Sequence, residues 1–115
     1  MSDLRILVCG GRTYNNAGRI RLVLEEYVHL DPVVMHGAAP GADSLAAQEA
    51  ADMGFKVEAF PANWRDHGYA AGPIRNRQML DTAPDLVIAF GGGKGTKDCV
   101  QEARRRGTLV REVGR

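Results

Sequence analysis

The sequence predicts an α/β fold, a Rossmann-like doubly wound sheet of about five parallel strands with about four helices. Short apolar runs alternate along the chain with segments of helical periodicity, which is the pattern of parallel strands joined by crossover helices. Glycine-rich loops follow three of the apolar runs. The length of 115 residues is ordinary for one domain, so residues 1–115 are expected to form a single domain.

Two strand and helix pairs are predicted in the first half of the chain. The predicted elements are a strand over 4–9, a helix over 16–30, a strand over 33–36 and a helix over 42–53. Gly10 ends the first apolar run, and Pro32 follows the first helix. Alanines and Leu45 form the apolar stripe of the second helix, which Gly54 ends. The apolar runs indicate strands that are buried on both faces.

The second half continues the same alternation. Its predicted elements are a strand over 56–60, a helix over 73–82, a strand over 86–90, a helix over 96–106 and a strand over 109–113. Pro73 is acceptable in the first turn of a helix, and Gly107 is a typical residue at a helix end. The connection over 61–72 is longer than the usual connection of about two to six residues in α/β units, which favours a functional loop.

Composition and charge argue against several functions. The formal net charge of +1 gives no basic field, so no nucleic-acid partner is expected. No apolar run approaches about 18 residues and no signal-peptide pattern opens the sequence, so a cytoplasmic protein without a membrane partner is expected. Cys9 and Cys99 lie in unrelated segments without a CxxC motif, which favours reduced thiols over a zinc site. No metal and no cofactor is predicted.

The loop over 91–96, Gly-Gly-Gly-Lys-Gly-Thr, gives the strongest binding signal. It lies between a buried strand and a helix, where exposed amides and the positive helix end suit a phosphate. Gly95 separates Lys94 from Thr96, so this is not a Walker loop, and the spaced motif G-x-G-x-x-G is absent after the first strand. ATP hydrolysis and an ordinary NAD site are therefore disfavoured.

The loop after the first strand offers a second anion site. Gly10 and Gly11 let the backbone approach a ligand closely, and Arg12 and Thr13 supply a guanidinium and a hydroxyl suited to a phosphate or a carboxylate. The alternative is a tight turn followed by a solvated arginine.

The loop after the second strand contains His36, Gly37, Gly41 and Asp43. Asp43 would either cap amides at the helix start or accept the hydroxyls of a ribose. His36 ends a buried strand, where a histidine is more often a hydrogen-bonded structural group than a catalytic one.

The long connection supplies aromatic and basic candidates. Trp64 or Tyr69 would stack on a base and His67 would carry a proton, or the aromatic rings would pin the loop to the body of the protein. Arg75 and Asn76 follow in the first turn of the next helix, where an arginine either holds a phosphate or lies on the surface.

Together these segments resemble the YspA-type, cpYpsA-related family of the SLOG superfamily, which is related to the Lonely Guy phosphoribohydrolases and to DprA. The resemblance rests on residues 10–14 (GGRTY), 36–43 (HG and GAD), 60–64 (FPANW), 71–76 (AGPIRN) and 89–96 (AF and GGKGT). It covers nearly the whole chain. It implies a Rossmann-like sheet that binds a nucleotide or a derivative, such as a ribose phosphate or an ADP-ribose-like molecule. It also implies a homodimer or a higher homo-oligomer, because Lonely Guy proteins commonly dimerise.

The catalytic relatives carry a PGGxGTxxE motif and an upstream arginine, and this chain departs from that motif twice. Arg75 matches the arginine, but Gly91 replaces the proline and Cys99 replaces the glutamate. Asp98 is adjacent, yet neighbouring helix positions point about 100° apart, so it is not a direct substitute. A nucleophilic role of Cys99 near the helix N-terminus is disfavoured because no partner base is evident.

The sequence therefore predicts a sensor or processing module that binds a nucleotide-derived ligand. The expected ligand contacts are Gly10, Gly11, Arg12, Thr13, His36, Gly37, Gly41, Asp43, Trp64, Arg75, Asn76, Gly92, Gly93, Lys94, Gly95 and Thr96. One alternative is an N-glycosidic hydrolase in which Arg75 orients the phosphate and Asp43 or Asp98 activates water or steadies the sugar. A further alternative is a non-catalytic protein-interaction domain, in which the glycines form turns and the loop with Trp64 docks a partner.

Overall fold

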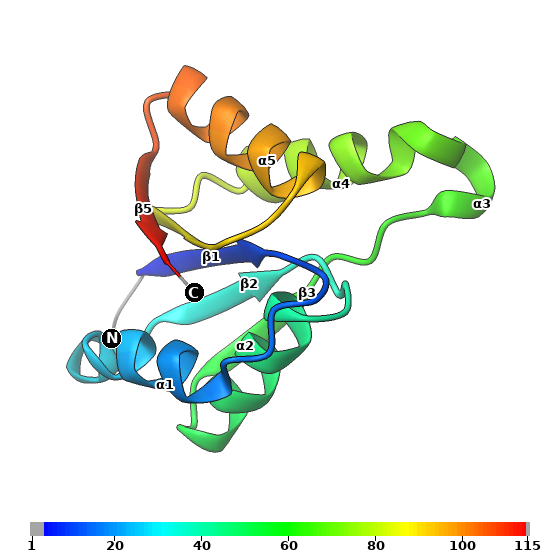
Figure 1. Cartoon of the computed structure of the whole chain (residues 1–115). Helices are drawn as coiled ribbons and strands as arrows, with labels where there is room; N and C mark the ends of the chain where they lie inside the picture. The colour runs from blue at the N-terminus through cyan, green and yellow to red at the C-terminus, as the bar shows by residue number, and fades with distance from the viewer. Residues whose placement is uncertain (1–3, 115) are drawn as a thin grey trace.

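The computed structural model describes residues 4–114 and contains one parallel sheet of five strands in the order β3-β2-β1-β4-β5. The strands are β1 (Arg5–Gly10), β2 (Val33–His36), β3 (Lys56–Ala59), β4 (Leu86–Phe90) and β5 (Leu109–Val113). The long helices are α1 (Ala17–Glu25), α2 (Ala42–Asp52), α4 (Ala71–Asp81) and α5 (Lys94–Arg105). α1 and α2 cover one face of the sheet, and α4 and α5 cover the other (Figure 1). The predicted doubly wound α/β class is confirmed.

Alternate residues of β1 face the two helix layers. Ile6 and Val8 belong to the core beneath α1 and α2, whereas Leu7 and Cys9 belong to the core beneath α4 and α5. All four side chains are buried. The central strand is thus apolar at these positions because both of its faces are covered.

The first helix is shorter than predicted. α1 ends at Glu25, and a 3₁₀ turn, η1 (Val28–Leu30), completes the predicted stretch. The N–H groups of Glu26 and Tyr27 donate to carbonyl groups three residues earlier, so the last turn tightens before Asp31, whose φ is 46°. No helix within residues 4–114 has both the length and the apolar character needed to cross a membrane.

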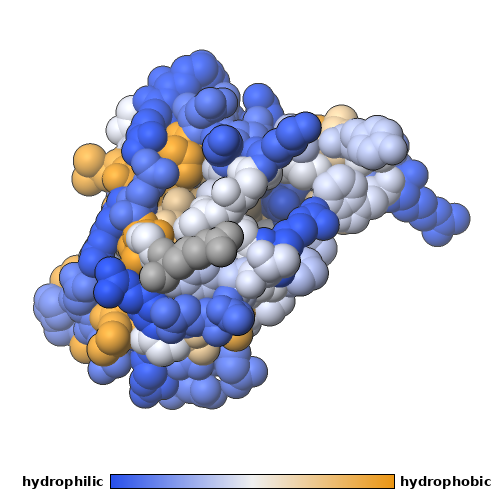
Figure 2. All heavy atoms as spheres, viewed as in Figure 1, coloured by the Kyte–Doolittle hydropathy of each residue, from blue (hydrophilic) through white to orange (hydrophobic). Residues whose placement is uncertain are grey.

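The long connection before α4 is not an open loop. A single helical turn, α3 (Trp64–His67), and a 3₁₀ turn, η2 (Gly68–Ala70), occupy it and lead directly into α4 at Ala71, two residues before the predicted start at Pro73. Proline is tolerated there because first-turn N–H groups have no partner within the helix. We call residues 61–70 the arm, because they project away from the sheet (Figures 1 and 2). The last helix also begins two residues before the prediction, at Lys94.

The strand order reverses at β1. β1 pairs with β2 on one side and with β4 on the other. The chain leaves β1 toward α1 on one face of the sheet and leaves β4 toward α5 on the opposite face (Figure 1). Two loops that diverge in this way open a crevice beyond the carboxyl ends of the strands, which is where doubly wound folds bind ligands.

Candidate functional site

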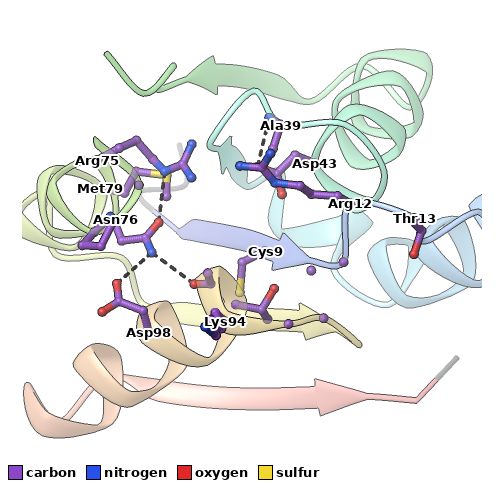
Figure 3. Close-up of a pocket in the computed structure, with 18 of the residues that line it drawn as sticks. Cys9, Arg12, Thr13, Ala39, Asp43, Arg75, Asn76, Met79, Lys94 and Asp98 are labelled. Carbon is purple, nitrogen blue, oxygen red and sulfur yellow. Dashed lines mark hydrogen bonds between the residues drawn. The ribbon is translucent and has the colours of Figure 1, made fainter. Parts of the chain in front are cut away.

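A cavity of about 790 Å³ opens beyond the carboxyl ends of β1 and β4 (Figure 3). Its walls come from the loop after β1, the loop after β2, the arm, the first turns of α4 and the loop that leads into α5. Of the predicted contacts, the lining includes Gly10, Gly11, Arg12, Thr13, Asp43, Trp64, Arg75, Asn76, Gly92, Gly93, Lys94, Gly95 and Thr96, together with Asp98. His36, Gly37 and Gly41 do not line it.

Three glycine-rich loops meet at this end of the sheet. The Gly11 N–H donates a hydrogen bond of 3.1 Å to the Phe90 carbonyl, and the Gly11 carbonyl accepts one of 3.1 Å from the Ala42 N–H. A Cβ atom on Gly10 would lie 2.6 Å from the Phe90 carbonyl oxygen. Gly41 has a φ of 77°, and a Cβ atom there would collide with the Gly11 carbonyl oxygen. Gly10 and Gly41 are therefore needed to bring the loops together.

The backbone N–H groups of the loop after β2 donate hydrogen bonds to side chains of the same segment. Asp43 Oδ2 accepts hydrogen bonds from the N–H groups of Gly37 at 2.8 Å and Ala39 at 3.4 Å. His36 Nδ1 accepts one from the Ala38 N–H at 3.0 Å. Asp43 thus caps the preceding loop and not the amides of α2, which begins after Gly41 without a side-chain cap. This loop has no backbone N–H left at residues 37–39 for a phosphate.

Burial controls the protonation of these two side chains. Burial raises the pKa of Asp43, and the hydrogen bonds from Ala39 and Gly37 and the charge of Arg75 oppose that shift. Burial lowers the pKa of His36 from its ordinary value. His36 is therefore a neutral, hydrogen-bonded group near pH 7, in agreement with the structural interpretation of this residue.

Arg75 is a buried cation that forms no ion pair with any residue between 4 and 114. Only 9% of its surface is exposed. Its Nε donates to Asn76 Oδ1 at 3.0 Å and its Nη1 donates to the Gly37 carbonyl at 2.5 Å, so both acceptors are neutral. Nη2 has no hydrogen-bond partner within residues 4–114, and the side chain lines the cavity. Burying a charge in this way costs several kcal/mol unless a counter-ion arrives.

Asn76 joins α4 to α5. Its Nδ2 donates to the Gly95 carbonyl at 3.2 Å and to Asp98 Oδ2 at 3.0 Å, while its Oδ1 accepts the bond from Arg75 (Figure 3). Asp98 Oδ2 also lies 3.9 Å from Arg77 Nη1. Asn76 was predicted as a ligand contact, but both ends of its amide are used to fix Arg75 and the start of α5.

The N-terminus of α5 offers free donors to the cavity. Gly93 precedes the helix and supplies no side-chain cap. The N–H groups of Lys94, Gly95 and Thr96 have no acceptor within residues 4–114. Free amides at the positive end of a helix suit an anion, and these amides line the same cavity as Arg75.

The arm brings aromatic rings to the rim of the cavity. The Arg12 guanidinium lies over the Trp64 ring, with its central carbon 5.5 Å from the ring centroid. The Trp64 side chain is about half exposed, and Tyr69 is fully exposed. Both residues line the cavity.

Cys99 does not enter the cavity. It is completely buried in the core beneath α4 and α5, together with Cys9, whose surface forms part of the cavity wall. The neighbouring Cys99 thiol and burial both raise the pKa of Cys9. The chain therefore has a buried thiol where catalytic relatives carry a carboxylate. Within residues 4–114, no cluster of histidine, cysteine and carboxylate side chains could hold a metal ion.

Sequence reasoning missed several lining residues, namely Cys9, Ala39, Gly72, Pro73 and Met79, whereas Tyr69 was named as one of two rings that would stack on a base. Helical spacing could have found some of them. Gly72 and Met79 lie three residues before and four residues after Arg75, so they share its face of α4. Ala39 carries no such signal, because the loop after β2 has no repeating pattern.

Comparisons with known proteins agree with this architecture. The structure is similar to that of the protein TM1055, with a TM-score of 0.73 at 19% identity over 93% of this chain and 72% of that chain. It is also similar to DNA processing protein A (DprA) from Streptococcus pneumoniae, with a TM-score of 0.61 at 17% identity over 95% of this chain and 58% of that chain. These two similarities show the fold.

Sequence comparison shows the family. The chain is 36% identical over 120 aligned positions to the Gene 61 protein of Mycobacterium phage D29, and the alignment covers 96% of each chain. The model of the YspA, cpYpsA-related SLOG family matches residues 4–67, which is more than half of the chain. This protein belongs to the YspA, cpYpsA-related SLOG family.

Proposed function

We propose that the cavity binds a nucleotide-derived ligand through a phosphate group. The observation that carries this proposal is the buried guanidinium of Arg75, which forms no ion pair within residues 4–114 and lines the same cavity as the uncapped N-terminus of α5. A phosphate there would form the ion pair that Arg75 lacks within residues 4–114 and would accept hydrogen bonds from the α5 amides. Membership of a SLOG family supports a nucleotide-derived molecule over other anions.

The remaining lining residues suit the rest of such a ligand. Asp43 Oδ2 is held by two amides, whereas its Oδ1 accepts no hydrogen bond within residues 4–114 and is available to a ribose hydroxyl. The exposed rings of Trp64 and Tyr69 offer flat apolar surface to a base.

Calorimetric titration tests the proposal. Nucleoside monophosphates and diphosphates, ribose 5-phosphate and ADP-ribose would be titrated into the protein and into an Arg75→Gln variant. We expect at least one compound to bind and Arg75→Gln to weaken it by about tenfold or more, because a charge-assisted hydrogen bond is lost. The matched control is Arg77→Gln on the exposed side of α4, which should leave affinity unchanged. The absence of binding by every compound would refute the proposal.

A second candidate function is cleavage of an N-glycosidic bond, which the free Oδ1 of Asp43 favours. A buried carboxylate in the cavity is suited to activate water at the sugar carbon. Asp98 is less suited, because it is already bonded to Asn76. Release of free base from nucleoside monophosphates, lost in Asp43→Asn and retained in Asp98→Asn, would support this activity. Binding without base release would leave the protein a sensor.

A further inference from the structure

Two guanidinium groups face the cavity from opposite walls. Arg75 enters from α4, and Arg12 enters from the loop after β1 (Figure 3). Neither forms an ion pair within residues 4–114. Like charges that face one another across a cavity repel, and an anion between them removes that repulsion.

The two arginines are held in place by different contacts. Hydrogen bonds to Asn76 and Gly37 fix Arg75 at the cavity wall. Arg12 is exposed and lies on the face of the Trp64 ring, and its side-chain N–H groups make no hydrogen bond within residues 4–114. Stacking on a ring orients a guanidinium and leaves its donor edge free for an acceptor.

The loop that carries Arg12 lies close to the loop that leads into α5. It directly follows Gly11, and a Cβ atom built on Gly11 would lie 3.3 Å from Gly92 Cα in the loop that leads into α5. An anionic group bound at the α5 amides thus has Arg75 on one side and the loop of Arg12 on the other.

We propose that the cavity selects a ligand with two linked phosphoryl groups, such as a nucleoside diphosphate or a compound with a diphosphate bridge. This inference rests on the proposed function and names its ligand class. The first phosphoryl group binds the α5 amides and Nη2 of Arg75. The second binds Arg12, and Trp64 is a positioning residue that holds Arg12 toward it.

The charge of the lining agrees with this ligand class. Arg12, Arg75 and Lys94 are its cations, and Asp43 and Asp98 are its carboxylates. Asp98 accepts a hydrogen bond from Asn76 and lies 3.9 Å from Arg77, which does not line the cavity, so Asp98 offsets little of the positive charge. The charge of Asp43 interacts with that of Arg75, which leaves Arg12 and Lys94 without a carboxylate partner in the lining. A monophosphate at α5 and Arg75 would leave the donors of Arg12 unused.

The test compares ligands that differ by one phosphoryl group. AMP, ADP, inorganic phosphate and pyrophosphate would be titrated by calorimetry into the protein and into Arg12→Ala. We expect ADP to bind about tenfold more tightly than AMP, and pyrophosphate more tightly than phosphate, because one more charge-assisted contact forms. Arg12→Ala should abolish both preferences, because it should weaken ADP and pyrophosphate about tenfold more than AMP and phosphate.

Three further variants isolate the positioning role. Arg65→Ala removes an exposed arginine of the arm that does not line the cavity, and it should leave the ADP to AMP ratio unchanged. Trp64→Leu should lower the ratio as Arg12→Ala does, and Trp64→Phe, which keeps a ring, should restore most of it.

The outcomes separate this inference from the proposed function. If AMP binds as tightly as ADP, or if Arg12→Ala weakens both equally, diphosphate selection is wrong and phosphate binding stands. If AMP, ADP and pyrophosphate all fail to bind, diphosphate selection is wrong, and binding of ribose 5-phosphate, ADP-ribose or another nucleotide then decides the proposed function.

Discussion

Nη1 of Arg75 donates a hydrogen bond of 2.5 Å to the carbonyl oxygen of Gly37, which joins α4 to the loop after β2. A Cβ atom on Gly37 would collide with the guanidinium group of Arg75. Gly37 does not line the cavity. Its contribution to the site is therefore steric, because the missing side chain leaves the space that Arg75 occupies.

Gly37→Ala should disable the site without unfolding the protein. The flexible arginine can move away from the new methyl group, at a cost of about 1 to 2 kcal/mol for the lost hydrogen bond. We expect a lower melting temperature and a loss of phosphate-ligand affinity as large as that of Arg75→Gln. Thermal unfolding and calorimetry measure the two effects.

Gly18→Ala is the control for this substitution. The new Cβ atom meets only Asn16 Oδ1, at 3.7 Å, and alanine in place of glycine in α1 should stabilise the protein by about 0.5 to 1 kcal/mol. The ligand affinity of Gly18→Ala should equal that of the parent protein.

Unaltered affinity in Gly37→Ala would show that Arg75 does not contact the ligand.

Gly93→Ala tests close approach of a ligand to the backbone. No heavy atom lies within 4 Å of a Cβ atom built on Gly93, and its φ of −108° is accessible to alanine. The melting temperature without ligand should fall by only a few degrees, because alanine at this capping position costs about 0.5 to 1 kcal/mol relative to glycine. The upward shift that a bound nucleotide causes should be lost, since the methyl group occupies the phosphate surface. A retained shift would mean that the glycines serve the turn alone.

The strands and the class of fold could be predicted because short apolar, β-branched runs between helical segments are a simple sequence signal. The strands over 33–36, 86–90 and 109–113 have the predicted bounds. Each of these runs carries strand-forming apolar residues between polar or turn-forming residues, and local sequence is enough to define it.

The roles of the site residues could not be predicted in the same way. Asn76 and Arg75 are neighbours in the first turns of one helix, but their different roles depend on which acceptors lie across the cavity. The sequence also does not reveal that the missing side chain of Gly37 leaves space for Arg75, because the two residues meet only in the folded protein. The projection of the arm could not be predicted either, because the exposure of Tyr69 depends on the direction in which a short helical turn leaves the sheet.

Cys99→Glu should destabilise the protein and not restore a catalytic site. Residue 99 is fully buried among apolar side chains, so a carboxylate there would be an unpaired buried charge. We expect a loss of about 3 kcal/mol or more in the free energy of unfolding, measured by urea denaturation. Cys99→Ala, which removes the thiol without adding charge, should cost about 1 kcal/mol. Equal stability of the Cys99→Glu and Cys99→Ala variants would show that the side chain at this position can turn toward the cavity.

Asp43→Asn should raise stability at neutral pH and lose this advantage in acid. The pKa of Asp43 is raised by burial, so the folded protein disfavours its ionised form, and the cost of ionisation is present above the raised pKa and absent well below the ordinary value of 3.8. Asparagine keeps an oxygen that can accept the hydrogen bonds from Gly37 and Ala39 and carries no charge. The difference in melting temperature between the variant and the parent protein should therefore be positive at pH 7 and shrink as the pH falls through the raised pKa. The charge of Asp43 partly offsets the lowering of the His36 pKa by burial, so Asp43→Asn lowers that pKa further and destabilises the variant in acid, which acts in the same direction. A difference that grows as the pH falls would mean that ionised Asp43 stabilises the fold, through Arg75 and the loop amides, more than burial penalises it.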